Sequence, residues 1–265
     1  MYDPFERRIT SLRISVTERC NLRCTYCMPE EGVPARSPGE FLSFEQIVAV
    51  ARAAVGLGIT KVRLTGGEPL VRRGIVDLVR MIAGIDGLDH LAMSTNGTLL
   101  APHARELKEA GLHSVNISLD TLDPVRYSQI TRGGRMEDAL AGMRAAVAEG
   151  FPVKINMVVM PDTTPAEIEG MRGFCSAEGA RLQRIRLYSL RQEKTDAGSF
   201  DRPHACESCN RIRLTADGML KPCLHSDSEV ALDFSHLADS LRAAVLAKPK
   251  RGSVCVGRAM PQIGG

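Results

Sequence analysis

The sequence predicts an α/β protein, built as an incomplete (β/α)6 TIM-type barrel with a small C-terminal appendage. Short β-rich runs alternate with segments of helical periodicity between residues 12 and 188. Cysteines, glycines and isolated polar residues follow nearly every run, where the loops of a barrel build its active site. An open doubly wound sheet is the competing architecture, and these rim residues favour the barrel.

Six strands are expected, with helical segments between them. They cover residues 12–16, 61–64, 91–94, 114–119, 153–159 and 184–188. In the first helix, Ser43 is expected to be the N-cap, because Gln46 follows three residues later and apolar residues continue at helical spacing to Gly58.

The pattern changes at about residue 192. A polar connector leads to a second cysteine group, a hairpin around Asp217-Gly218, one helix near residues 235–246 and a tail. We therefore expect residues 1–191 to form the partial barrel and residues 192–265 to form the C-terminal region.

Composition excludes several classes of protein. The 265 residues are 44% hydrophobic and carry a net charge of +3, with 34 basic and 31 acidic residues spread along the chain. No basic block predicts nucleic-acid binding, and no apolar run predicts a membrane span or a signal sequence. We expect a cytoplasmic protein, in which clustered cysteines indicate metal or catalytic sites before disulfides.

The first cysteine group consists of Cys20, Cys24 and Cys27, directly after the first strand. Three thiolates can ligate three irons of a [4Fe-4S] cluster and leave the fourth iron open for a small chelator. The alternatives are a structural zinc site or unrelated buried cysteines.

Cys20-Asn-Leu-Arg-Cys24-Thr-Tyr-Cys27 resembles the signature of the radical S-adenosylmethionine (SAM) superfamily. The resemblance implies that SAM binds the open iron and that its reductive cleavage gives a 5′-deoxyadenosyl radical. It implies that Tyr26 lies against the adenine. Gly66-Gly67-Glu68-Pro69 is similar to the superfamily's GGEP motif, which implies a role in holding the SAM amino group.

The second cysteine group consists of Cys206, Cys209 and Cys223, and the expected hairpin folds Cys223 back to the other two. A second [4Fe-4S] cluster with an open iron is the economical interpretation, which makes the C-terminal region an iron-sulfur-binding appendage. The alternative is a four-ligand site, either zinc or a closed cluster, completed by Cys255, His204 or His225.

The two triplets together resemble the GTP 3′,8-cyclase family, of which this chain would be a shortened variant. The resemblance implies two [4Fe-4S] clusters, SAM, and cyclisation of GTP to 3′,8-cyclo-7,8-dihydro-GTP, the first step of molybdenum cofactor (molybdopterin) biosynthesis. It implies that the radical abstracts the ribose 3′ hydrogen and that the carbon radical attacks guanine C8. It also implies a flavodoxin- or ferredoxin-type reductant and a downstream cyclic pyranopterin monophosphate synthase, with the enzyme a monomer or homodimer.

A triphosphate needs several charged donors from different elements. Arg13, Lys61, Arg63 and Lys154 alternate with apolar neighbours on expected strands, although each alone could be a solvated surface charge. The resemblance implies that these residues bind GTP, as do Ser94, Arg211, Ile212, Arg213, Gly264 and Gly265. It further implies catalytic roles for Arg211 and Arg213, and SAM contacts for Ser118 and Arg191.

The sequence departs from the family before the second triplet. Only residues 192–205 form the connector, and Ser189-Leu190-Arg191 stands where the family has Glu-Phe-Met. These differences leave room for another nucleotide substrate. A peptide-modifying radical SAM enzyme and a non-catalytic iron-sulfur protein are the alternative functions.

Overall fold

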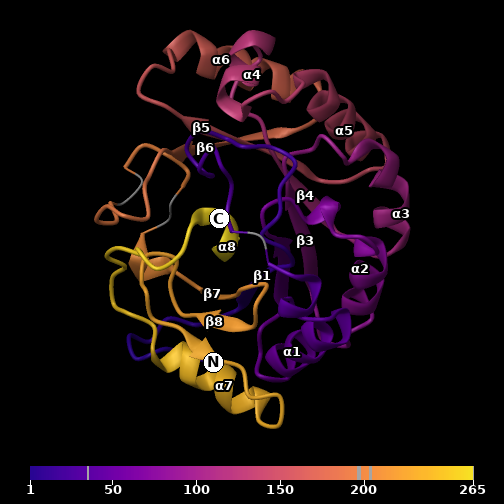
Figure 1. Ribbon diagram of the computed structural model, residues 1–265. Coiled ribbons are helices and arrows are strands. Elements are labelled where there is room, and N and C mark those ends of the chain that lie inside the picture. Colours follow the sequence, from indigo (N-terminus) through magenta and orange to yellow (C-terminus); the bar gives the residue numbers. More distant parts are fainter. Residues whose placement is uncertain (35, 196–197, 203–204, 265) are drawn as a thin grey trace.

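The fold is organised around one nine-stranded sheet whose first six strands are parallel and follow chain order (Figure 1). The computed structural model describes residues 1–34, 36–195, 198–202 and 205–264. The strand order is β6-β5-β4-β3-β2-β1-β7-β8-β9. The strands are β1 (Ser11–Ser15), β2 (Lys61–Thr65), β3 (His90–Thr95), β4 (Ser114–Ser118), β5 (Val153–Val159), β6 (Arg181–Arg186), β7 (Arg211–Leu214), β8 (Met219–Lys221) and β9 (Val230–Ala231).

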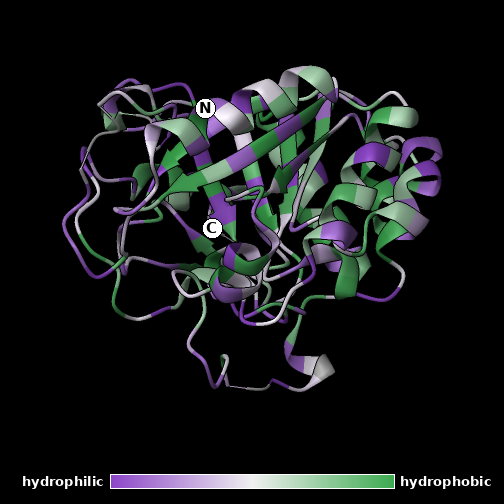
Figure 2. Ribbon diagram, turned by 90° about the horizontal axis from the view of Figure 1, so that it is seen from above, coloured by the Kyte–Doolittle hydropathy of each residue, from purple (hydrophilic) through white to green (hydrophobic). Residues whose placement is uncertain are grey.

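Helices lie outside the curved sheet, and the short C-terminal helix lies within the opening of the barrel (Figure 1). The outer helices are α1 (Phe44–Gly56), α2 (Ile75–Ala83), α3 (Ala104–Glu109), α4 (Pro124–Thr131), α5 (Met136–Ala148), α6 (Pro165–Ala177) and α7 (Leu237–Leu246), and the C-terminal helix is α8 (Met260–Ile263). Figure 2 shows hydrophobic residues concentrated in the central strands and hydrophilic stretches on the peripheral helices. None of the described helices is long and apolar enough to cross a membrane.

The order of the strands confirms the incomplete barrel and shows that the doubly wound alternative was wrong. A doubly wound sheet reverses its strand order at a switch point, whereas β1 to β6 here lie side by side in sequence. The expected strands are present, although β6 begins at Arg181, three residues before the expected start. The expected helix start is also confirmed, because Ser43 and Gln46 form a capping box.

Strand alternation separates the hydrophobic core from the interior of the barrel. Leu12 and Ile14 are fully buried in the main hydrophobic cluster, with Val62 and Leu64 as their register partners on β2. Successive side chains of a strand point to opposite faces, so Arg13 points away from that core. The same alternation directs polar residues of neighbouring strands into the barrel.

The C-terminal region continues the same sheet. β7 pairs in parallel with β1, so that Arg213 lies opposite Arg13 in the register, and the β7–β8 hairpin turns at Asp217-Gly218 as expected. The division of the chain at residue 191 stays a prediction.

Arg7 joins the two ends of the chain. Its guanidinium forms an ion pair of 2.6 Å with Asp3 and donates hydrogen bonds to the carbonyls of Cys206, Pro249 and Lys250. The Arg7 side chain is 8% exposed and that of Asp3 is fully buried. Removing one member of a buried pair leaves the other charge uncompensated.

We expect Arg7→Gln to lower the midpoint of thermal unfolding by roughly 5–10 °C, measured by circular dichroism on anaerobic protein. Arg80→Gln is the matched control, because Arg80 and its partner Asp77 are both exposed, and such pairs contribute little. Equal midpoints for the two variants would contradict the structural role of Arg7.

Candidate active site

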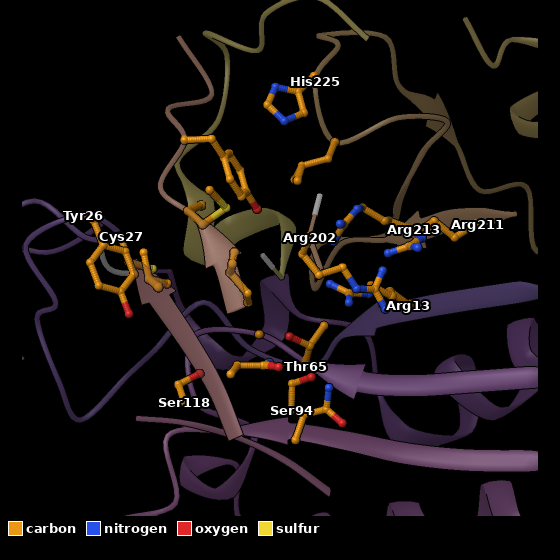
Figure 3. A pocket seen from close by; sticks show the side chains of 18 of the residues that line it. Arg13, Tyr26, Cys27, Thr65, Ser94, Ser118, Arg202, Arg211, Arg213 and His225 are labelled. Atoms are coloured by element: carbon orange, nitrogen blue, oxygen red, sulfur yellow. The ribbon is translucent and has the colours of Figure 1, made fainter. Parts of the chain in front are cut away.

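Both cysteine groups line a single cavity of about 280 Å³ at the carboxyl ends of the barrel strands. All six cysteines are free thiols: Cys20, Cys24, Cys27, Cys206, Cys209 and Cys223. Figure 3 shows Tyr26 and Cys27 on one side of this cavity and a group of arginines on the other. The structure therefore brings together two groups that are about 180 residues apart in the sequence.

The first cysteine loop is held from the outside by the end of α4. The backbone N–H of Thr25 donates to the carbonyl of Ile130 at 2.9 Å. Arg132, in the left-handed conformation, donates to the carbonyls of Arg23 and Met28. These bonds fix the loop while its thiols face the cavity.

The three thiols suit a cationic iron-sulfur cluster. Burial raises the pKa of Cys20, Cys24 and Cys27, with neighbouring cysteines adding to the effect at Cys24 and Cys27; that of Cys27 rises to about 12. Iron bound to the sulfurs would offset this cost, since metal coordination deprotonates a thiol. Among the described residues, no three His, Cys, Asp or Glu side chains are grouped so as to hold a single metal ion. In a cubane cluster each thiolate binds a different iron.

The loop after β2 brings backbone close to the first cysteine loop. Gly67 N–H donates to the carbonyl of Thr17 and Glu68 N–H to that of Arg19, both at 2.8 Å. A Cβ on Gly66 or Gly67 would collide with the backbone of residues 17 to 19. Only glycine permits this approach, and both glycines line the cavity.

The side chain of Glu68 is fully buried and points away from the cavity lining. Its carboxylate accepts hydrogen bonds from the Leu70 N–H, the Thr95 hydroxyl and the Asn96 N–H, at 2.6 to 3.1 Å. Burial raises its pKa to about 7 even though these bonds act in the opposite direction. Glu68 thus ties the glycine loop to the end of β3.

Tyr26 is oriented by a buried carboxylate. Its hydroxyl donates to Asp120 Oδ2 at 2.7 Å, and Asp120 Oδ1 accepts from the Val158 N–H at 2.8 Å. Burial raises the pKa of Asp120 to about 6. Ser118 at the end of β4 lines the same part of the cavity (Figure 3).

The second cysteine group lies beside a lysine that was not predicted from the sequence. Lys248 Nζ donates at 2.8 Å to the carbonyls of both Arg211 and Pro222. Burial acts to raise the pKa of Cys209, but Lys248 and Arg211 outweigh it and the pKa lies below its ordinary value. The Cys209 thiol therefore loses its proton more readily than a free cysteine does.

The residues considered as a fourth ligand differ in their positions. His225 lines the cavity, and its two ring nitrogens have no hydrogen-bond partner within the described part of the chain. Cys255 is fully buried against Leu190 and Ile263 and does not line the cavity. His204 lies outside the described residues.

Three neighbouring strands place arginines beside one another. Arg63, Arg13 and Arg213 occupy matching register positions on β2, β1 and β7. Burial lowers the pKa of Arg13 well below its ordinary value and those of Arg63 and Arg213 to about 10; the positive charge of Arg211 adds to this at all three. Such a cluster is suited to binding a polyanion.

A second cavity of about 380 Å³ lies toward the beginning of the strands. Lys61 and Arg63 line it, while Arg13 and Arg211 line both cavities. The two cavities are therefore adjacent and share basic residues in their linings.

Only some of the remaining predicted site residues line a cavity. Ser94 lines the first cavity and accepts a hydrogen bond of 3.4 Å from Arg63, and the carbonyl of Gly264 accepts one from Arg213. Lys154 and Arg191 line neither cavity, and the Arg191 side chain is exposed. Ile212 is fully buried in the core. Gly265 lies outside the described residues.

Several residues that line the cavity were not singled out from the sequence. They include Asn116, Asn156, Gln183, Lys194, Arg202 and Lys248. Strand alternation was the available signal for Asn116 and Asn156, because each lies between two apolar residues of its strand. Gln183 lies before the expected start of its strand and is followed by Arg184.

A family model described as the radical SAM superfamily matches residues 14–175. The chain therefore belongs to this superfamily, which implies a [4Fe-4S] cluster and SAM binding.

Solved structures agree on the fold. Streptococcus suis SuiB bound to S-adenosylmethionine superposes with a TM-score of 0.70 at 14% identity, covering 91% of this chain and 64% of SuiB. Native anSMEcpe with bound AdoMet gives 0.67 at 15% identity, covering 91% and 81%.

Curated relatives identify the family within that class. GTP 3′,8-cyclase of Alkaliphilus oremlandii is 39% identical, with all of both chains covered, and that of Peptoclostridium acidaminophilum is 42% identical over 88% of this chain and 85% of its own. The chain belongs to the GTP 3′,8-cyclase family. The first alignment spans 320 positions and this chain has 265 residues, so at least 55 positions of that relative have no counterpart here.

We expect Tyr26→Phe to destabilise the protein by about 1–3 kcal/mol, because Asp120 Oδ2 would lose its donor in a buried setting. The free energy of unfolding in urea would measure this loss. Tyr127→Phe is the matched control. Tyr127 is 2% exposed and is more deeply buried than Tyr26, but its hydroxyl has no hydrogen-bond partner among the residues described, so its removal should cost almost nothing. A larger loss at Tyr127 than at Tyr26 would refute this account.

Proposed function

We propose that this protein converts GTP to 3′,8-cyclo-7,8-dihydro-GTP in a SAM-dependent radical cyclisation, the first step of molybdenum cofactor biosynthesis. The observation that carries the proposal is the shared cavity, which two cysteine triplets line and which leads into the arginine cluster. A substrate there can meet both triplets while its anionic part reaches the arginines. The names of the curated relatives support the same reaction.

The first triplet would hold the [4Fe-4S] cluster that the superfamily implies. We propose a second [4Fe-4S] cluster on Cys206, Cys209 and Cys223, within a C-terminal region that begins at about residue 192. When bound, the first cluster and SAM would supply the 5′-deoxyadenosyl radical. The protein's own contribution is to bind, orient and enclose the reactants.

The chain offers distinct groups for the two ligands. For SAM we propose the backbone at Gly66 and Gly67, the Tyr26 ring and Ser118; Glu68 acts by holding the glycine loop in place. Arg191 is the weakest candidate, since its side chain is exposed.

For GTP we propose that Arg13, Lys61, Arg63 and Lys154 provide positive charge for the triphosphate. Ser94, Ile212 and the terminal Gly264 and Gly265 belong to the same proposed site. Arg211 and Arg213 of β7 line the same cavity as the second triplet, and there they would stabilise the late, reduced stage of the reaction.

The proposed reaction needs partners. An external reductant of the flavodoxin or ferredoxin type would deliver electrons in the cytoplasm, and a cyclic pyranopterin monophosphate synthase would take the product. We propose a monomer or homodimer that needs neither nucleic acid nor a membrane.

Anaerobic reconstitution with dithionite, SAM and GTP is expected to yield 5′-deoxyadenosine and an isomer of GTP, both detected by mass spectrometry. SAM cleavage without the isomer would overturn the cyclase and leave a different radical SAM substrate, such as a peptide. Intact SAM after reduction would favour a non-catalytic iron-sulfur protein.

Cys209→Ala is expected to retain SAM binding and abolish the cyclised product, because it removes a ligand of the second cluster only. Wild-type protein should contain about eight irons per chain and the variant clearly fewer. Cys175→Ala serves as the control, since Cys175 is buried on α6 and lines neither cavity. About four irons in the wild type would contradict the second cluster.

A further inference from the structure

The connector between β6 and β7 adds to the free edge of the barrel. Arg202 forms a parallel bridge with Ile185 of β6, and its backbone N–H donates to the carbonyl of Arg184 at 3.2 Å. The Arg186 N–H donates in return to the carbonyl of Arg202 at 3.0 Å. A connector that pairs with β6 in this way fixes the backbone at Arg202.

Neighbouring contacts strengthen this attachment. Arg184 donates through its backbone N–H to Asp201 Oδ2 and through Nη2 to the carbonyl of Ser199, both at 2.8 Å. Side-chain and backbone contacts thus hold the residues just before Arg202.

The Arg202 side chain points to the junction of the two cavities. Arg202 lines both of them, a property it shares with Arg13 and Arg211. In Figure 3 the side chains of Arg202, Arg13, Arg211 and Arg213 gather on the side opposite Tyr26 and Cys27. The connector therefore contributes a further guanidinium to the strand-borne cluster.

This guanidinium has an incomplete set of protein partners. Its Nη1 atom is buried and donates to no acceptor among the described residues. Burial, together with Arg211, Arg63 and Arg213, lowers the pKa of Arg202 to about 10. An unpaired donor among like charges is costly in the protein alone and is relieved by an anion.

We propose that Arg202 is a substrate-binding residue that donates hydrogen bonds to the phosphate chain of the nucleotide. This inference rests on the proposed function. The two cavities meet at Arg202, so the base would extend toward the cysteine-lined cavity and the phosphates would lie at the junction. A planar guanidinium with an unpartnered donor nitrogen is suited to phosphate oxygens.

The test compares the anaerobic, reconstituted wild-type enzyme with Arg202→Gln and Arg202→Lys. Dissociation constants for GTP, GMP and guanosine are measured by equilibrium dialysis with SAM present. Arg202→Gln should weaken GTP binding roughly 10- to 100-fold, weaken GMP binding less and leave guanosine binding unchanged. Arg202→Lys should fall between the wild type and Arg202→Gln, because it keeps the charge and loses the planar fork.

Arg172→Gln is the matched control. Arg172 lies on α6, is largely exposed and pairs with Glu169, so its removal should leave GTP affinity unchanged. Cluster absorbance and SAM affinity verify that each variant is folded. If Arg202→Gln loses either of them, GTP affinity is compared between the wild type and Arg202→Lys instead. Unchanged GTP affinity in the folded variants, or an equal loss for guanosine, would overturn the proposal.

Inorganic triphosphate separates this proposal from the proposed function. If the wild type forms no GTP isomer but binds triphosphate, and Arg202→Gln weakens that binding, the cyclase assignment fails and the phosphate-binding role of Arg202 stands. If the wild type binds neither GTP nor triphosphate, both are overturned.

Discussion

The parallel pairing of β7 with β1 is the interaction on which the site depends. It places Arg213 opposite Arg13 and brings Cys209, just before β7, to the cavity that the first cysteine loop lines. Without this pairing, the second triplet would have no fixed position relative to the first. The pairing therefore converts two separate cysteine motifs into one site.

The same geometry concentrates positive charge inside the barrel. Matching register positions on β2, β1 and β7 are all occupied by arginine, and the connector adds Arg202. Like charges at such spacing oppose folding unless an anion neutralises them. A ligand that carries several negative charges would thus contribute to the stability of the fold as well as occupy the site.

Much of the fold and of the site could be predicted because the signals are local. Strand alternation located the strands, the Ser43 capping box located the first helix, and close spacing revealed the cysteine triplets. Other features depend on contacts between distant residues and leave no local pattern. Arg132 lies in an ordinary surface turn by sequence, yet it holds the first cysteine loop.

The roles of Glu68 and Arg202 could not be predicted for the same reason, because they depend on contacts between residues that are distant in the sequence. A GGEP motif shows where Glu68 lies in the chain, but only the structure shows its carboxylate bound to the end of β3. Arg202 belongs to a short polar connector, and only the pairing with β6 directs it into the cavity. Arg191 is the opposite case. It occupies the position of a family motif, but its side chain is exposed and does not line the cavity.

The Arg7 contacts impose an order on the biogenesis of the protein. During synthesis the first cysteine loop and β1 leave the ribosome early, but the carbonyls that Arg7 needs lie at residues 206, 249 and 250. The strand that pairs with the second edge of β1 also emerges late, because β7 spans Arg211–Leu214. Until it emerges, this edge of β1 resembles the exposed edges that promote aggregation. The carbonyl partners of Arg7 and the second neighbour of β1 therefore both emerge well after the first cysteine loop.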